Sequence, residues 1–287
     1  MNSFIKNLTF LLVTYKSEHI IGECIEKIPK ESKIIIIENS KNSNLAEQFK
    51  DNDNLEVILN KNLGYGQAIN LGLSKINTNY AFLISPDVLL GNNTLKSIFE
   101  AIDTLKNEFT VIGPIGTKIE NEKNSIKEES ISSGHAMLIN LDNVKNKKLF
   151  DENFFLFYDD IDFCIEIKKY GGKIYTVGNC DIKHYGKNST KYSFEVEVLR
   201  NYHYYWSHFY FHKKHDGILL AYIRSSKKFF GSLSQYFFAV LLFKQKKRYM
   251  NKYKVLGLVH SILGKPASLR LEDLTRDFWF FYKIESS

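Results

Sequence analysis

The sequence predicts an α/β fold in which a mixed, mostly parallel sheet is flanked by helices and followed by a basic helical segment. Short apolar runs rich in β-branched residues alternate with helical patterns along the first part of the chain, and this alternation predicts right-handed crossovers and α/β layers. One run, residues 33–37, holds four consecutive isoleucines, which is typical of strands buried on both faces of a parallel sheet. With 287 residues, 44% of them hydrophobic, the chain is long enough for one large domain or for one domain and an appendage.

The predicted elements follow one another at short intervals. Strands are predicted at residues 8–13, 33–37, 55–59 and 80–84, and helices at residues 18–27, 42–50, 65–75 and 93–106. Beyond Val111 the pattern is less regular, and the polar stretch 119–130 is expected to be an exposed loop or hairpin. A strand at 133–141, a helix at 158–170 and short strands at 173–177 and 181–184 complete this part. Gly171 and Gly172 follow that helix, as expected of a glycine stop signal.

Charge divides the chain in two. The formal net charge is +7, but residues 200–287 carry 16 Lys and Arg against 5 Asp and Glu, whereas residues 1–199 carry 23 against 27. We therefore expect a globular α/β domain over residues 1–199 and a helical, aromatic and basic region over residues 200–287. A region this basic can meet anionic lipid, nucleic acid or a phosphorylated substrate.

The cysteines and the apolar runs bear on the cellular compartment in which the protein is expected. Cys24, Cys164 and Cys180 are few, odd in number and not spaced as metal ligands, which argues against a disulfide framework and is typical of a reducing environment. The run at 8–13 lacks a cleavage site and is interpreted as a strand, not a signal peptide. No run reaches the roughly 18 apolar residues of a membrane span, and the nearest, 229–243, is short. We expect a cytoplasmic protein, either free or peripheral on the inner face of the cytoplasmic membrane.

Polar residues collect where the predicted strands end. Thr14 and Tyr15 follow the first strand, Glu38 follows the second, and Ser85 and Asp87 follow the fourth. In open α/β sheets, ligands bind beyond the carboxyl ends of the strands. These five residues are therefore candidates for a ligand site.

The third strand leads into a glycine-containing turn with Asn62, Gly64, Gly66 and Asn70. The two glycines suggest a dinucleotide loop, but the third glycine position holds Ile69, and the motif follows the third strand and not the first. The alternative is a tight turn into a helix, where glycines supply a positive φ. That alternative does not account for Asn62 and Asn70.

Five acidic residues stand among aromatic residues in the window 150–162. Because ionised side chains are rarely buried without partners, this cluster suggests a pocket that uses negative charge, and such carboxylates are candidate general bases. The alternative is that Asp159, Asp160 and Asp162 cap and charge the first turn of a helix.

Asp87 and His184 are candidate ligands of a divalent metal. A carboxylate in the position of Asp87 can hold a hard cation that also bridges a diphosphate, and His184 follows a short strand. The alternatives are that Asp87 belongs to a turn-forming Pro-Asp pair and that His184 is structural or merely exposed.

Taken together and in order, these segments resemble the inverting nucleotide-sugar glycosyltransferases of family 2 with the GT-A fold, and most closely the bacterial rhamnosyltransferase-like members. The resemblance covers about residues 7–190. It is carried by residues 13–15, 37–40, 62–72, 85–88, 133–137, 150–152, 159–162 and 184–186.

The resemblance implies a role for each candidate. Thr14, Tyr15 and Glu38 would lie against the nucleoside, and Asn62, Gly64, Asn70 and Ser85 would shape the nucleotide-sugar pocket. Asp87 and His184 would hold Mg²⁺ or Mn²⁺. Asp160 would be the catalytic base, with Asp159 beside it.

Three positions depart from the family pattern. Ser85 replaces the first acidic residue of the metal motif, so strict metal dependence stays open. The pair Asp159-Asp160 stands where Glu-Asp is usual. Glu38 stands where aspartate is commoner, which leaves the nucleobase open.

The function implied by the resemblance is inverting transfer of a sugar, rhamnose or a similar hexose, from a dTDP- or UDP-sugar to a hydroxyl of a glycan. The expected partners are that donor, a glycan or lipid-linked oligosaccharide acceptor in surface polysaccharide synthesis and an anionic membrane surface, but no nucleic acid. A sugar-phosphate nucleotidyltransferase is an alternative, although its glycine-rich loop with Arg is absent from the sequence. A non-catalytic basic adaptor for membrane or nucleic acid would leave Asp87, Asp160 and His184 unexplained.

The basic region supports the membrane expectation. Residues 200–254 combine aromatic and aliphatic residues with clusters of Lys and Arg, a composition that suits a helix in a membrane interface. Such residues near anionic lipid contribute roughly 1 kcal/mol each. The alternative is that these helices pack on the first domain and expose a solvated basic face.

Overall fold

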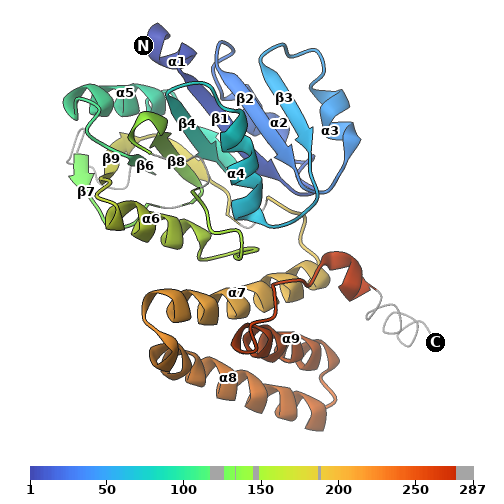
Figure 1. Ribbon diagram of the computed structural model, residues 1–287. Helices are drawn as coiled ribbons and strands as arrows, with labels where there is room; N and C mark the ends of the chain where they lie inside the picture. Colours follow the sequence, from blue (N-terminus) through green and yellow to red (C-terminus); the bar gives the residue numbers. More distant parts are fainter. Residues whose placement is uncertain (117–125, 133, 145–148, 187–188, 276–287) are drawn as a thin grey trace. The chain divides into compact units, whose positions relative to one another are not determined.

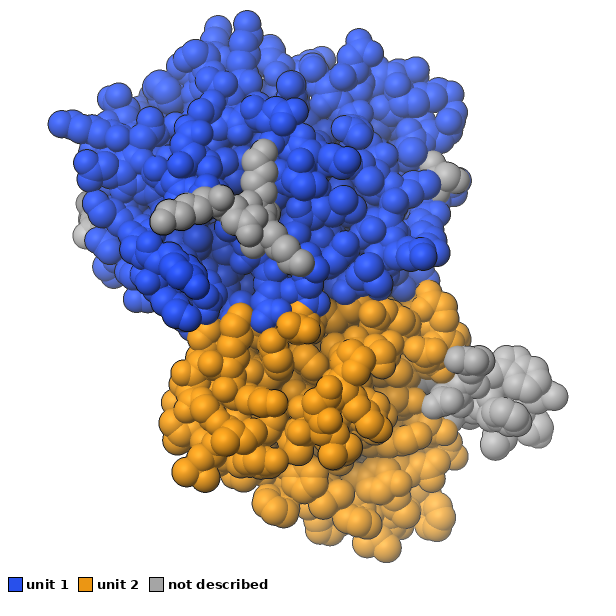
Figure 2. Space-filling model, in the orientation of Figure 1, with its two compact units in different colours: residues 1–152, 159–191 blue, residues 153–158, 192–287 orange. Residues whose placement is uncertain are grey.

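The computed structural model describes residues 1–116, 126–132, 134–144, 149–186 and 189–275. The chain forms two compact units, coloured separately in Figure 2: unit 1 consists of residues 1–152 and 159–191, and unit 2 of residues 153–158 and 192–287. The boundary expected at 199/200 falls inside helix α7 (Phe194–His215). This helix begins after Ser193, whose hydroxyl accepts a hydrogen bond from the backbone N–H of Val196, so the helix starts before the basic composition does.

Unit 1 is built on an eight-stranded sheet with the order β3-β2-β1-β4-β8-β6-β9-β7 (Figure 1). Its strands are β1 (Leu8–Thr14), β2 (Lys33–Glu38), β3 (Leu55–Leu59), β4 (Tyr80–Ile84), β6 (Val111–Gly116), β7 (Ile126–Glu128), β8 (Ala136–Asn140) and β9 (Ile174–Cys180). The pairs β1–β2, β1–β4, β2–β3 and β6–β9 are parallel, and β4–β8, β6–β8 and β7–β9 are antiparallel. The predicted mixed sheet is therefore confirmed.

Helices cover both faces of this sheet. They are α1 (Asn2–Lys6), α2 (Ile21–Glu26), α3 (Ser43–Gln48), α4 (Tyr65–Lys75), α5 (Thr94–Thr104) and α6 (Asp159–Lys169), with a short 3-10 turn at Leu141–Asn143. Side chains of β1 alternate between the faces: Phe10 belongs to a core cluster that includes residues of α1, α2, α3 and α5, and Leu11 belongs to a second cluster that includes residues of α4 and α6. This alternation follows from the period of two in a strand.

Three elements of unit 1 were not predicted. Strand β5 (Val88–Leu90) and helix α1 are too short to show a clear periodicity. Strand β6 contains Gly113 and Pro114, which argue against a strand in a sequence pattern, and its register with β9 shifts between Pro114 and Gly116. Of the polar stretch 119–130, residues 119–125 lie outside the described residues, and β7 lies in the remainder.

Unit 2 contains the three long helices α7, α8 (Ile218–Leu241) and α9 (Gln245–Ile262) (Figure 1). Helices α7 and α9 approach closely because Gly257 has no side chain: a Cβ there would lie 2.3 Å from the carbonyl oxygen of Tyr202. The core around this contact includes Tyr202, Trp206 and Tyr253. Among the described helices, none is both long enough and apolar enough to cross a membrane.

Candidate active site

Buried polar side chains tie the carboxyl ends of β1 and β2 together. Thr14 and Glu38 are both fully buried, and the Thr14 hydroxyl donates a hydrogen bond to the Glu38 carboxylate. The other oxygen of that carboxylate accepts from the backbone N–H and the hydroxyl of Ser40. In this conformation both carboxylate oxygens of Glu38 are hydrogen-bonded within the protein, so Glu38 fixes the carboxyl ends of β1 and β2.

Tyr15 opens the loop after β1. Its backbone N–H donates to the Ser17 hydroxyl (3.2 Å), and its carbonyl accepts from the Thr190 hydroxyl (3.0 Å). The Ser17 hydroxyl donates to the carbonyl of Ser189 (2.6 Å). The chain that follows β10 (Ile182–His184) therefore returns to the end of the first strand.

Helix α4 starts at a glycine turn and carries a buried amide. Gly64, its N-cap, has a φ of +123°, a region that favours glycine, and Asn62 is half-buried in the loop ahead of it. The Asn70 amide nitrogen donates to the carbonyl of Phe150 (2.8 Å), and its oxygen accepts from the backbone N–H groups of Leu149 and Phe150 (3.0 Å each). Asn70 thus clamps the chain that leads into the acidic window.

The two residues predicted as metal ligands lie together. Strands β5 and β10 pair antiparallel, with Val88 opposite His184, and Asp87 immediately precedes β5. Asp87 is buried, and its Oδ1 lies 3.5 Å from Nε2 of His184. The short two-stranded sheet is what joins these residues across the sequence.

A second imidazole, which the sequence analysis did not single out, stacks on His184. The rings of His135 and His184 are 4.4 Å apart between centroids and nearly parallel, at 11°. The His135 carbonyl accepts from the backbone N–H of Ser85 (2.9 Å). Burial lowers the pKa of His135 and the neighbouring His184 lowers it further, whereas the charge of Asp87 acts in the opposite direction. Little in the sequence signalled this role, because His135 sits in a predicted strand among core residues.

The residue before His135 contacts Asp160. The backbone N–H of Gly134 donates to Oδ2 of Asp160 (3.1 Å). A Cβ at Gly134 would lie 2.8 Å from both Cβ and Oδ2 of Asp160, so the close approach depends on glycine. Asp160 is half-exposed and therefore accessible to a ligand. Gly134 and His135 are neighbours in the chain, so one short segment contacts both Asp160 and His184.

Asp159 has a different environment at the start of α6. It is buried, and within the described residues its Oδ2 makes no hydrogen bond. Burial raises the pKa of Asp159 to about 7, and the charges of Asp160 and then Asp162 contribute to the rise. Asp162 is buried as well. The first turn of α6 therefore carries one accessible carboxylate and two buried ones.

Tyr65, the first residue of α4, connects these groups and was missed as a site residue. Burial raises the pKa of its hydroxyl, the charges of Asp159, Asp160 and Asp87 raise it further, and a hydrogen bond with the side chain of Ser85 opposes the rise. The charges of Asp87, which lies between β4 and β5, and of Asp159 and Asp160 in α6 thus all raise the pKa of the Tyr65 hydroxyl. Its place directly after the glycine turn was the available signal.

The residues fit a metal ion that binds together with a diphosphate. Within the described residues, no group of three or more His, Cys, Asp or Glu side chains is arranged to hold a metal. Asp87 and His184 offer two ligands, one of them a buried carboxylate. Mg²⁺ and similar hard ions typically take one or two carboxylates and complete their shell with water and substrate phosphates, so two protein ligands are compatible with such an ion.

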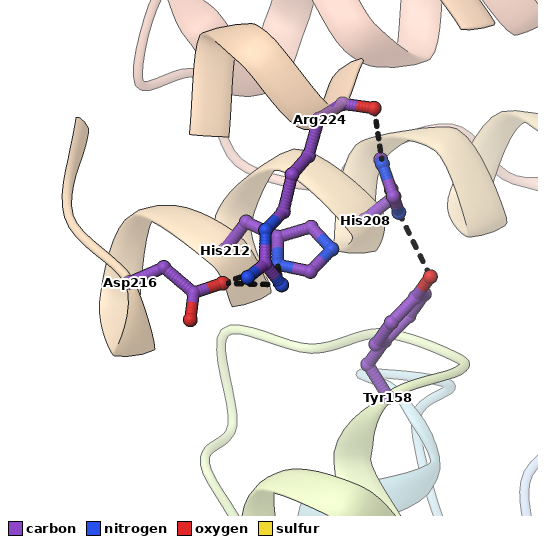
Figure 3. Close-up of polar contacts among 5 residues, drawn as sticks. All are labelled: Tyr158, His208, His212, Asp216 and Arg224. Atoms are coloured by element: carbon purple, nitrogen blue, oxygen red, sulfur yellow. Dashed lines mark hydrogen bonds and ion pairs between the residues drawn. The ribbon is translucent and has the colours of Figure 1, made fainter. Parts of the chain in front are cut away.

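The chain ahead of Asp159 belongs to unit 2 and is held by α7 (Figure 3). The Ser207 hydroxyl donates to the carbonyl of Leu156 (2.9 Å), and the Tyr158 hydroxyl lies 2.8 Å from Nδ1 of His208. Phe157 and Tyr158 have φ values of +70° and +65°. Left-handed backbone at residues other than glycine costs about 1–3 kcal/mol each, so these contacts maintain a strained conformation directly before the acidic turn.

The same cluster joins α7 to α8, as Figure 3 shows. Nδ1 of His212 lies 2.6 Å from Oδ2 of Asp216, and the Arg224 guanidinium lies 3.0 Å from that oxygen. Nε2 of His208 lies 3.4 Å from the carbonyl of Arg224. Burial lowers the pKa of His208 to about 4, so His208 is neutral near pH 7 and its Nδ1 can accept from Tyr158.

Known proteins share this fold. The mannosyltransferase PcManGT from Pyrobaculum calidifontis, solved with GDP-Man and Mn²⁺, superposes with a TM-score of 0.52 at 12% identity over 90% of this chain and 88% of that one. GalNAc-T7, solved with UDP, GalNAc and Mn²⁺, gives a TM-score of 0.51 at 13% identity over 62% of this chain and 42% of that one. At these identities the likeness establishes the GT-A-like fold.

Sequence comparisons identify the family. The low-salt glycan biosynthesis hexosyltransferase Agl10 of Haloferax volcanii is 20% identical over 207 residues, and the match covers 63% of this chain and 66% of that protein. The chain thus spans just under two thirds of that relative's length. The model of the family described as "Glycosyl transferase family 2" matches residues 9–166, more than half of the chain. The chain therefore belongs to glycosyl transferase family 2.

Proposed function

We propose that this protein is an inverting glycosyltransferase that moves a hexose, rhamnose or a similar sugar, from a dTDP- or UDP-sugar to a hydroxyl of a glycan. The acceptor is a lipid-linked oligosaccharide in surface polysaccharide synthesis. Family membership and the similarity to the Haloferax volcanii relative, which is named as a glycan biosynthesis hexosyltransferase, support the reaction class. The rhamnose and the dTDP or UDP carrier rest on the sequence resemblance described above.

One observation carries the proposal. Gly134 and His135 are adjacent; the first donates a hydrogen bond to Asp160, and the ring of the second stacks on His184, which lies 3.5 Å from Asp87. The same short segment therefore contacts the Asp160 carboxylate, the candidate base, and His184, which with Asp87 is suited to a metal-bound diphosphate. Glycosyl transfer needs both, because negative charge develops on the leaving diphosphate while the attacking hydroxyl loses its proton.

Asp160 supplies the base in this proposal. The acceptor oxygen attacks the anomeric carbon, and the bond from that carbon to the diphosphate oxygen breaks, so its electron pair leaves with the nucleoside diphosphate. The acceptor proton passes to the Asp160 carboxylate. Attack on the face opposite the leaving group inverts the anomeric configuration.

Asp87 and His184 would hold Mg²⁺ or Mn²⁺, which when bound offsets charge on the diphosphate. Two structural neighbours were solved with Mn²⁺, and this supports the assignment of a divalent ion. The Ser85 hydroxyl, close to Asp87, can donate a hydrogen bond to a phosphate oxygen.

The remaining predicted residues bind the nucleotide and the sugar or position the segments that bind them. Thr14 and Glu38 act by fixing the ends of β1 and β2, where Tyr15 opens the loop that would meet the nucleoside. Asn62 and Gly64 shape the turn into α4. Asn70 acts indirectly, since its amide holds residues 149 and 150.

The direct test is Asp160→Asn with a measurement of both donor binding and transfer. Donor affinity by calorimetry should be retained, whereas transfer should fall by about 10²–10⁴-fold, the usual contribution of a general base. The exposed Asp103→Asn in α5 is the matched control and should be unaffected. Near-normal transfer by folded Asp160→Asn would remove Asp160 from this role.

The metal assignment has its own test. A thermal-shift comparison of UDP, dTDP and Mn²⁺, alone and in pairs, should show an extra rise in Tm when nucleotide and metal are present together, because each ligand stabilises the native state by mass action. Asp87→Asn should abolish that extra rise. An unchanged rise in Asp87→Asn would place the ion elsewhere.

A further inference from the structure

Helix α8 of unit 2 directs its large apolar side chains outward. Leu219, Ile223, Phe230, Phe237 and Leu241 are all exposed, with exposed fractions from 58% to 71%. Their spacing of four, seven, seven and four residues places them along one face of a helix with 3.6 residues per turn. We call this row the outer face of α8.

The opposite face of α8 is the one that packs. Its buried residues are Ala221, Ser225, Ser232 and Ala239, which are all small. Ala221 lies in a cluster with Phe209 of α7 and Leu258 of α9. A helix of a globular protein ordinarily turns its apolar stripe toward the core and its polar side chains outward. Here the buried residues are small, Phe229 packs against them in part, and the large apolar residues of the outer face point away from the bundle.

The apolar row continues past the end of the helix. Leu242 and Phe243 follow directly, and Phe243 is 90% exposed. Extended exposed apolar patches mark interaction sites for proteins or membranes, since isolated soluble proteins rarely keep them. The outer face of α8 therefore needs a covering surface.

Charge selects the kind of surface. Between residues 217 and 271 the sequence has eleven Lys and Arg and no Asp or Glu. Lys227 lies within the outer face, between Ile223 and Phe230, and the exposed Lys244, Lys246 and Lys247 follow Phe243. A second copy of the chain would bring the same positive charge to the contact, whereas an anionic lipid surface is complementary to it.

We infer that the outer face of α8, with Phe243 and the lysines at the start of α9, is a docking surface for an anionic lipid bilayer. The helix lies in the plane of the interface. Its Leu, Ile and Phe side chains enter the boundary between headgroups and acyl chains, and the lysines remain among the headgroups. The inference stands on unit 2 and does not depend on the proposed chemistry.

Flotation of the full-length chain with vesicles tests the inference. The chain should float with vesicles of phosphatidylcholine containing phosphatidylglycerol and remain unbound with phosphatidylcholine alone. Lys244→Gln/Lys246→Gln/Lys247→Gln should weaken partitioning on the order of 100-fold, from roughly 1 kcal/mol for each basic residue. Lys27→Gln/Lys30→Gln/Lys33→Gln removes the same charge from exposed positions of unit 1 and should have little effect.

The apolar row is tested with Phe230→Ser/Phe237→Ser, whose side chains are exposed and whose loss should leave the circular dichroism spectrum unchanged. Flotation should be lost, while the matched change at exposed apolar residues of unit 1, Ile131→Ser/Tyr170→Ser, should retain it. Phe230→Trp should show a blue-shifted tryptophan emission with anionic vesicles and quenching by brominated lipid, and Tyr170→Trp should show neither.

Two outcomes would overturn the inference. One is flotation that survives the serine changes with no emission shift at position 230, which would mean adhesion by charge alone. The other is no flotation together with an oligomer that Phe230→Ser/Phe237→Ser dissociates, because a second copy of the chain would then cover this face.

Discussion

Replacing Asp159 by asparagine tests whether the start of α6 holds a desolvated carboxylate. The pKa of Asp159 rises from an ordinary value of 3.8 to about 7, chiefly through burial. A folded-state pKa above the unfolded value means that the folded chain binds the proton more tightly. The associated stability is therefore fully present below about pH 4 and is lost as the pH rises through about 7. The asparagine side chain of the variant cannot ionise and does not follow this course.

The size of the effect follows from the same values. At about pH 5.5 the retained proton is worth roughly 2 kcal/mol, and at about pH 8.5 almost nothing, from 1.36 kcal/mol for each pKa unit. The natural chain should therefore lose roughly 2 kcal/mol of unfolding free energy relative to Asp159→Asn between these two pH values. Any constant effect of the substitution itself cancels in this comparison.

Urea unfolding followed by circular dichroism at both pH values measures the difference. Asp51→Asn, at an exposed carboxylate of unit 1, is the control and should track the natural chain. If the gap between the natural chain and Asp159→Asn is the same at both pH values, Asp159 is not desolvated, and the described packing at the start of α6 is incorrect.

Three further changes probe the surroundings of this turn. Gly134→Ala places a methyl group 2.8 Å from Asp160 and should lower kcat about 10²-fold with donor affinity kept, since small misplacements have effects of this size; an unchanged kcat contradicts the close approach. Asn70→Ala leaves several buried backbone groups unpaired and should lower unfolding free energy by about 2–4 kcal/mol, measured in urea, and a loss below about 1 kcal/mol speaks against the clamp. Tyr158→Phe removes the hydrogen bond to His208 and should lower the unfolding free energy by about 1 kcal/mol. It should also lower kcat while changing the KM for the donor less. A variant with the stability and the kcat of the natural chain would show that this hydrogen bond does not position the chain ahead of Asp159.

Much of unit 1 was predictable because its central strands β1, β2 and β4 are buried on both faces. The isoleucine run of β2 and the apolar runs of β1 and β4 are confirmed at nearly the predicted bounds. Strand β6 was missed because Gly113 and Pro114 break the apolar pattern, although its neighbours in the sheet supply the pairing. Local pattern cannot show such tertiary support.

The site was predictable by residue type but not by contact. Asp87 and His184 could be named, but their proximity arises from pairing of β5 with β10, strands of three residues each. Tyr65 and His135 were not named, because a phenol at the start of a predicted helix and an imidazole in a predicted strand carry no local sign of the contacts that they make. For α8, the sequence indicated an apolar and basic helix, but only the structure shows that the small residues face the bundle.

The course of the chain at residues 153–158 has a consequence for dissecting the protein. The polypeptide leaves unit 1 after Glu152, visits unit 2, and returns at Asp159, so no single cut separates the two units with both intact. A fragment ending at residue 191 would keep every strand of the sheet while stripping Leu156 and Tyr158 of their partners on α7. Residues 153–158, which lead into the acidic first turn of α6, would then lack the contacts that hold them in the full chain, so the environment of Asp159 and Asp160 should be studied in the full chain.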